Sequence, residues 1–256
     1  MDFVKIEKNG NVGIVTLDKP DTMNALNSVV LEELKQAVDQ VESDDEIFVV
    51  ILTGTGSAFV SGADIAEMST KTPLQAKAYS SKGAKLFRRI ELLEKPVICV
   101  LNGVAFGGGC ELAMSCDIRL AGEKIKMGLP EVTLGITPGF SGTVRLPRLI
   151  GVAKAKEWIF SGKIATAQEA LEVGLVNAVY PHDVLMEEAL ALAQKIAANS
   201  QSAIRLCKDL LGHTLEMDID SAIDLEVNVE ALSFGSHDQI EGMAAFKEKR
   251  KANFNQ

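Results

Sequence analysis

Residues 97–114 read VICVLNGVAFGGGCELAM, in which an apolar run leads through three glycines into a second apolar segment. The first run is typical of a strand that is buried on both faces. A similar run, FVVIL, occupies residues 48–52, and a helical pattern lies between the two. Parallel strands require a crossover of this kind. The sequence therefore predicts an α/β fold with parallel strands.

The sequence on either side extends this prediction. Strand character at residues 4–6 and 12–17, separated by Asn9-Gly10-Asn11, predicts an N-terminal hairpin. Ser28 is placed to cap a helix that ends near residue 43. Beyond Gly151 the strand signal nearly disappears. Apolar spacing there predicts a mostly helical layer, with helices at residues 154–160, 167–173, 184–198, 203–211 and 220–232.

Composition excludes several classes of protein. The chain has 256 residues, with 47% hydrophobic and 24% charged residues, which is typical of a globular protein. Its length allows one large domain or one domain with a helical appendage. A net charge of −9 disfavours nucleic acid and anionic membranes as partners. Four cysteines and three histidines form no metal-binding pattern, so no metal site is expected.

The N-terminus has no basic segment followed by an apolar run. We therefore expect a cytoplasmic protein, with a processed organellar form as the alternative. One glycine-rich segment, GTGSAF at residues 54–59, begins like a dinucleotide-binding motif. Phe59 stands where the third glycine of that motif is needed, so a flexible loop is favoured over nicotinamide binding.

Three successive glycines, Gly107 to Gly109, open a predicted helix and expose backbone N–H groups there. These donors and the helix dipole are suited to hold an oxygen on which negative charge develops. The alternative is that the glycines only permit tight packing. Glu111 follows in the first turn, where it could act as a base or merely cap the helix. Glu131 lies in a second, turn-rich segment, and two such carboxylates suit acid–base chemistry.

Together these residues resemble the enoyl-CoA hydratase/isomerase (crotonase) superfamily, in particular its short-chain enoyl-CoA hydratases. The resemblance covers essentially the whole chain. It is carried by six motifs in family order, at residues 24–27, 61–65, 102–111, 130–131, 135–139 and 246–250.

The resemblance implies a crotonase-like spiral of ββα units followed by C-terminal helices that mediate trimerisation, with two trimers commonly stacking into a hexamer. We place the spiral core at residues 1–195 and the helical oligomerisation region at residues 196–256. The implied partners are an acyl-CoA thioester substrate and further copies of the chain, with no nucleic acid or membrane.

The implied activity is that of a hydro-lyase in fatty acid β-oxidation, which adds water reversibly to a short or medium trans-2-enoyl-CoA and gives 3-hydroxyacyl-CoA. In this resemblance the backbone N–H groups of Ala63 and Gly108 form the oxyanion hole. Glu111 activates the water that adds to Cβ, and Glu131 delivers the proton to Cα. No cofactor is implied, because coenzyme A is part of the substrate.

The resemblance also implies a set of residues that contact the substrate or its coenzyme A: Ala25, Ser61, Ala63, Asp64, Ile65, Gly139, Phe246 and Lys249. Lys249 would be a point charge for a phosphate, with a solvated surface lysine as the alternative. Leu129 stands where many hydratases carry glutamine, which could raise the pKa of Glu111. Phe140 and Ser141 replace a pair of small residues and could narrow the acyl site.

Three other functions remain open from the sequence. A Δ3,Δ2-enoyl-CoA isomerase could use the carboxylate of Glu131 alone. A hydratase or hydrolase for cyclic or branched acyl-CoA would differ in residues 68–86, which shape the acyl site. A non-catalytic RNA-binding or scaffold protein could use the basic stretch between Lys77 and Arg89, although the net charge argues against it.

Overall fold

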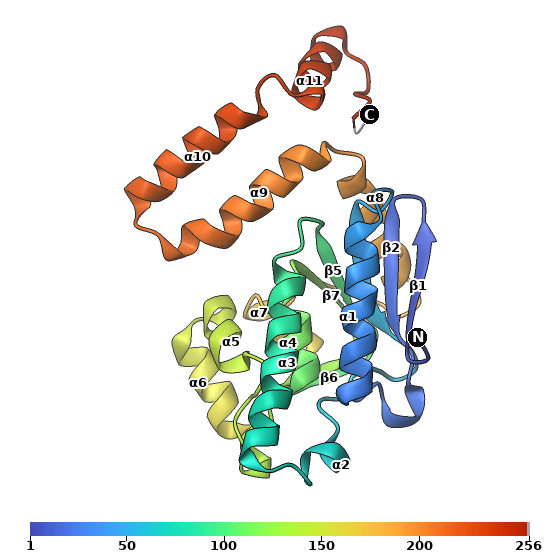
Figure 1. The fold of residues 1–256 in the computed structure, drawn as a ribbon, viewed down its shortest axis with the longest axis vertical. Coiled ribbons are helices and arrows are strands. Elements are labelled where there is room, and N and C mark those ends of the chain that lie inside the picture. Colours follow the sequence, from blue (N-terminus) through green and yellow to red (C-terminus); the bar gives the residue numbers. More distant parts are fainter. Residues whose placement is uncertain (255–256) are drawn as a thin grey trace.

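The computed structural model describes residues 1–254, so the last two residues of the predicted oligomerisation region lie outside it. Its strands form two sheets (Figure 1). The larger contains, in spatial order, β1 (Val4–Asn9), β2 (Val12–Leu17), β3 (Val49–Gly54), β5 (Val97–Leu101), β7 (Ile118–Gly122) and β10 (Ala178–Tyr180). The smaller contains β4 (Ala58–Val60), β6 (Val104–Phe106), β8 (Lys126–Gly128) and β9 (Ile164–Thr166).

From β3 to β8, successive strands of the chain alternate between the two sheets. The pairs β3/β4, β5/β6 and β7/β8 each send their first strand to the large sheet and their second strand to the small one. Strands β2, β3, β5, β7 and β10 run parallel, whereas β1 and β2 form an antiparallel hairpin. The predicted hairpin and the predicted parallel strands are therefore confirmed.

Helices cover both faces of the large sheet. α1 (Ser28–Ser43) and α3 (Pro73–Glu91) lie side by side against one face, and α8 (Leu185–Ala197) packs on the other (Figure 1). The cap predicted for α1 is displaced by one residue. Asn27 is the N-cap, with its Oδ1 accepting from the N–H groups of Val29 and Val30, while Ser28 is the first helical residue. The Ser28 hydroxyl is free to bond elsewhere, because the asparagine satisfies the helix end.

Short helices complete the body of the molecule: α2 (Ile65–Met68), α4 (Gly108–Met114), α5 (Gly142–Ile150), α6 (Val152–Ser161) and α7 (Ala167–Glu172). Three 3₁₀ turns span Pro20–Thr22, Glu131–Leu134 and Thr214–Glu216. The mostly helical layer predicted after Gly151 is confirmed, but it also contains two short strands, β9 and β10, that the sequence did not reveal. Each has only three residues, too few for an alternating pattern to show in the sequence.

The last helices are α9 (Gln201–His213), α10 (Ile219–Ser233) and α11 (His237–Glu248). Together with the segments that join them, including the 3₁₀ turn Thr214–Glu216, we call them the C-terminal arm. In Figure 1 the arm, coloured orange to red, lies at the opposite end of the molecule from α2. Many of its large apolar side chains are exposed, among them Leu211, Leu215, Ile219, Leu232 and Phe246.

Within residues 1–254, no helix combines the length and the apolar character needed to cross a membrane.

Candidate active site

A cavity of about 580 Å³ lies among α2, α3, α4 and the 3₁₀ turn Glu131–Leu134. Both predicted catalytic carboxylates and both predicted oxyanion-hole residues line it. The predicted contact residues Ser61, Ile65 and Gly139 do so as well. The structure therefore brings together, in one cavity, residues that are up to 78 positions apart in the sequence.

The backbone around Ala63 directs its N–H group away from the neighbouring strand-like segment. Leu26 forms a parallel bridge with Ala63. The Leu26 N–H donates to the Gly62 carbonyl at 2.8 Å, and the Leu26 carbonyl accepts from the Asp64 N–H at 2.9 Å. Successive N–H groups of an extended chain point to opposite sides. The Ala63 N–H consequently faces away from Leu26 and is not used by this bridge.

Gly108 supplies the second donor because it is the first residue of α4. The first N–H groups of a helix have no acceptor within that helix, and they carry the positive end of its dipole. The positions on either side of Gly108 require glycine. Gly107 has φ +49°, and a Cβ at Gly109 would lie 2.1 Å from the Val60 carbonyl oxygen. The three glycines therefore both permit tight packing and leave backbone N–H donors exposed.

Glu111 is held in the cavity wall by two backbone donors. Its Oε1 accepts from the N–H groups of Phe140 at 2.8 Å and Gly142 at 2.6 Å. Glu111 is only 1% exposed. Burial raises its pKa to about 7, although the two hydrogen bonds oppose this increase. The negative charge of Glu131 adds to the increase. At neutral pH, Glu111 thus has a substantial ionised fraction and can accept a proton.

Glu131 has a different environment. Its Oε2 is buried and has no hydrogen-bond partner, and burial raises the pKa of this carboxyl as well. A Cβ at Gly107 would lie 3.1 Å from the Glu131 Oε1, so a side chain there would have to displace this carboxyl slightly. A hydrogen bond from the Glu131 backbone opposes this increase in pKa but does not outweigh burial. The two carboxyls therefore differ in their hydrogen bonding: Glu111 accepts from two backbone N–H groups, whereas the Glu131 Oε2 accepts from none.

The floor of the cavity is aromatic. The ring of Phe140 lies with its centroid 5.3 Å from those of Tyr79 and Phe87. Phe140 and Tyr79 both line the cavity. Tyr79 was missed by the sequence analysis, because its position on the buried face of α3 is indistinguishable from an ordinary core position. The residue before the turn, Leu129, is also buried and offers Glu111 no polar group, as expected from the sequence.

Four other predicted contact residues lie outside the cavity lining. Ala25 is one of them. Asp64 instead caps α2, its Oδ1 accepting from the Glu67 N–H at 3.1 Å. Phe246 and Lys249 lie on α11 and at its end, far from α2 in Figure 1. Neither Phe246 nor Lys249 lines this chain's own cavity, and their contact with coenzyme A stays a prediction.

The other sequence motifs resolve into structural roles. The segment GTGSAF joins β3 to β4 and is followed by a strand instead of the helix that a dinucleotide site needs. Basic residues of the stretch 77–89 are largely ion-paired: Lys82 with Glu32, and Arg89 with Asp39 and Glu42. Among residues 1–254, no three His, Cys, Asp or Glu side chains are grouped for metal binding.

Comparison with known proteins agrees with this geometry. Residues 7–256 match the model of the family described as enoyl-CoA hydratase/isomerase. The short-chain-enoyl-CoA hydratase of Clostridium acetobutylicum is 47% identical, covering 98% of this chain and 97% of that protein. The crotonyl-CoA hydratase of Syntrophomonas wolfei is 46% identical, covering 97% and 96%.

Solved structures give the same result for the fold. A crystal structure of enoyl-CoA hydratase from Bacillus anthracis, 38% identical, superposes with a TM-score of 0.96 and covers 98% of both chains. This likeness confirms the crotonase-like spiral predicted from the sequence. The chain belongs to the enoyl-CoA hydratase/isomerase family.

Proposed function

We propose that this protein is an enoyl-CoA hydratase, which adds water across the double bond of a trans-2-enoyl-CoA. One observation carries the proposal: Glu111, with hydrogen-bonded Oε1, and Glu131, with an unpartnered Oε2, line the same cavity as Ala63 and Gly108. The names of the two relatives support the same activity.

The chemistry follows from these positions. Water gives a proton to ionised Glu111 as its oxygen bonds to Cβ, and the electrons of the double bond move onto the thioester oxygen. The Ala63 and Gly108 N–H groups stabilise the charge on that oxygen. Protonated Glu131 then gives its proton to Cα, and proton exchange with solvent restores both carboxyls. The balance needs only water and the thioester, so no metal or redox cofactor takes part.

The aromatic floor supports a short acyl chain. Phe140 and Tyr79 are buried and close the cavity beneath Gly108, where a Cβ would lie 3.0 Å from the Phe140 ring. An acyl chain that extends past the reacting carbons meets these rings. Crotonyl-CoA, with only one carbon beyond the double bond, is therefore the substrate we expect to react fastest.

The test is the loss of enoyl-thioester absorbance when the purified protein is mixed with crotonyl-CoA, hexenoyl-CoA and decenoyl-CoA. Rapid loss with crotonyl-CoA and slower loss with the longer chains is expected. Conversion of 3-butenoyl-CoA without hydration of crotonyl-CoA would instead establish an isomerase. No reaction with any straight chain, despite binding of coenzyme A, would point to a cyclic or branched acyl group.

We also propose that the C-terminal arm joins copies of this chain into a trimer or a dimer of trimers. Support comes from its exposed apolar side chains and from the position of α11 far from the cavity of its own chain (Figure 1). In that assembly Phe246 and Lys249 would reach the coenzyme A bound to a neighbouring copy. The division into a core of residues 1–195 and an oligomerisation region of residues 196–256 belongs to the same proposal.

A further inference from the structure

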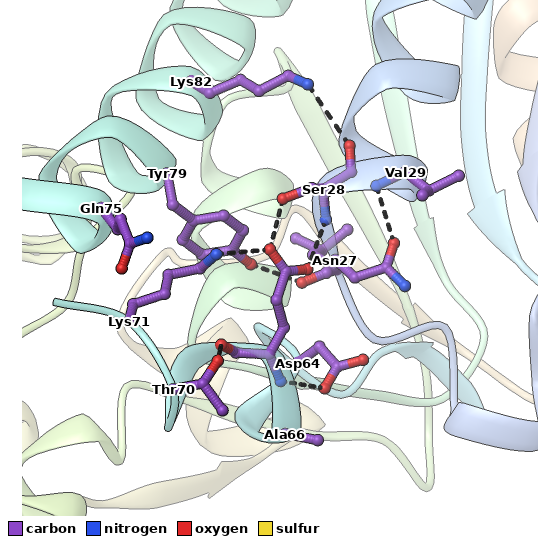
Figure 2. Close-up of polar contacts among 12 residues, drawn as sticks. Asn27, Ser28, Val29, Asp64, Ala66, Thr70, Lys71, Gln75, Tyr79 and Lys82 are labelled. Carbon is purple, nitrogen blue, oxygen red and sulfur yellow. Dashed lines mark hydrogen bonds and ion pairs between the residues drawn. The ribbon is translucent and has the colours of Figure 1, made fainter.

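Glu67 on α2 joins three segments that surround the Ala63 donor. Its Oε2 accepts from the Ser28 N–H at 2.8 Å, and its Oε1 accepts from the Ser28 hydroxyl at 2.5 Å and from the Lys71 ammonium at 2.7 Å. Ser28 begins α1, and Lys71 lies just before α3. Figure 2 shows the Lys71 side chain reaching toward Ser28 at the start of α1.

The same cluster reaches the residue that aligns Ala63. The Lys71 ammonium lies 5.0 Å from the centre of the Tyr79 ring, which favours a cation–π interaction. The Tyr79 hydroxyl donates to the Leu26 carbonyl at 2.5 Å. Leu26 is the residue whose backbone bonds to the peptide groups on either side of Ala63. Two sets of hydrogen bonds therefore join residues 26–28 to residues 62–67: those of the Leu26 backbone and those of the Glu67 carboxylate.

Packing alone does not hold α2 in place. The helix has four residues, and none of them is fully buried. An isolated helix of this length is unstable in water. Met68 packs partly against the core, and the other contacts that hold the helix are polar: the Asp64 cap and the hydrogen bonds of Glu67.

Glu67 is ionised when it makes these contacts. Partial burial alone would raise its pKa, but the hydrogen bonds from Lys71 and Ser28 outweigh burial and lower the pKa to about 2. Hydrogen bonds to a charged acceptor are about twice as strong as neutral ones. The cluster is therefore intact throughout the pH range in which Glu111 titrates.

We propose that Glu67 is a positioning residue for the oxyanion hole: by binding Ser28 and Lys71, it fixes α2 and so aims the Ala63 N–H at the thioester carbonyl. The inference builds on the proposed hydratase function, in which Ala63 is one of the two donors. Glu67 itself is not expected to touch the reacting atoms.

The experiment compares the full-length Glu67→Ala and Glu67→Gln variants with wild type. Glutamine keeps an oxygen for Ser28 but loses the charge that binds Lys71. Glu32→Gln is the matched control, because Glu32 also joins α1 to α3, through an ion pair with Lys82 of 2.9 Å, and does not line the cavity. Thermal unfolding of each variant reports whether it is folded.

Two readouts separate positioning from stability. The first is the split between kcat and KM for crotonyl-CoA. The second is the carbonyl stretching frequency of bound butyryl-CoA, labelled with carbon-13 at the carbonyl. This saturated thioester cannot be hydrated, and its stretching frequency falls when donors polarise the carbonyl.

We expect kcat to fall about 10- to 100-fold in Glu67→Ala, below the loss of about 100- to 1,000-fold for removing a whole oxyanion-hole donor. KM should change little in either variant. The kcat of Glu67→Gln should lie between those of wild type and Glu67→Ala. The carbonyl frequency should move back toward that of free butyryl-CoA, less in Glu67→Gln than in Glu67→Ala. Glu32→Gln should match wild type. If Glu67→Ala does not fold, Glu67→Gln alone must show the reduced kcat and the frequency change.

Two results would overturn the inference in different ways. In the first, the carbonyl frequency of butyryl-CoA is equally lowered in wild type and in Glu67→Gln, and kcat is unchanged. This result would support the oxyanion hole but contradict the positioning role of Glu67. No lowered frequency in wild type would contradict the oxyanion hole itself, and the role of Glu67 with it.

Discussion

The spiral core and the C-terminal arm differ in how completely each is packed within one chain. Helix α4, which carries Gly108 and Glu111, buries all seven of its residues, whereas α10 buries only Ala222 among its fifteen. The core therefore supplies its own support for the catalytic groups. The arm leaves many of its apolar side chains exposed in the single chain, and in the proposed assembly these side chains would be buried against another copy. The two regions should respond to mutation through different observables.

The largest effect is expected for charges on the arm. Leu215 and Leu232 are 89% and 72% exposed in the single chain. Full burial of a leucine contributes about 1.5–3 kcal/mol, and each substitution acts at every copy of the interface. We expect Leu215→Glu combined with Leu232→Glu to abolish the assembly. Light scattering would measure the molar mass.

Phe160→Glu is the control for this prediction, because Phe160 is 74% exposed but lies on α6 in the core. Its molar mass should equal that of wild type. A monomeric wild-type protein, or an assembly that survives both arm substitutions, would show that the arm is not the interface.

The next effect concerns the core alone. Replacing Glu111 or Glu131 with glutamine keeps the side-chain volume but removes proton transfer. General acid–base catalysis contributes about 100- to 10,000-fold, so hydration of crotonyl-CoA should slow by that factor in each variant. Because the arm is untouched, the molar mass should not change. Near-normal hydration by either variant would exclude the two-carboxylate mechanism.

A smaller effect follows from the pKa of Glu111, which burial raises to about 7. The base must be ionised, so its active fraction decreases as pH falls through this value. We expect kcat/KM for hydration to decrease about tenfold per pH unit below about 7. A rate that is constant between pH 5 and pH 7 would contradict the assignment of Glu111 as the base.

Sequence reasoning succeeded where short motifs determine local backbone geometry. The glycines at 107–109 and the two glutamates predicted the donors and carboxyls that meet in one cavity. Tyr79 and Glu67 were missed because their roles depend on contacts with Leu26 and Ser28, which are about 40 to 50 residues away. Strands β9 and β10 were missed because each has only three residues, too few for a sequence pattern. Pairing with β8 and β7, respectively, stabilises them.

The smallest effect compares a glycine of the core with one of the arm. A Cβ at Gly83 on α3 would lie 2.5 Å from the Phe140 ring, whereas a Cβ at Gly212 on α9 meets nothing within 4 Å. Overpacking costs about 1–3 kcal/mol. In an open helical position, alanine is favoured over glycine by about 0.5–1 kcal/mol.

Gly83→Ala should therefore lower Tm and Gly212→Ala should raise it slightly, as measured by calorimetry. Gly83→Ala should also reduce hydration several-fold, because a displaced Phe140 shifts the N–H that bonds to Glu111. Adding Phe140→Leu should recover part of the lost stability, since the smaller side chain leaves room for the new methyl group. Equal changes in Tm for both glycine variants would mean that the core is no more tightly constrained than the arm.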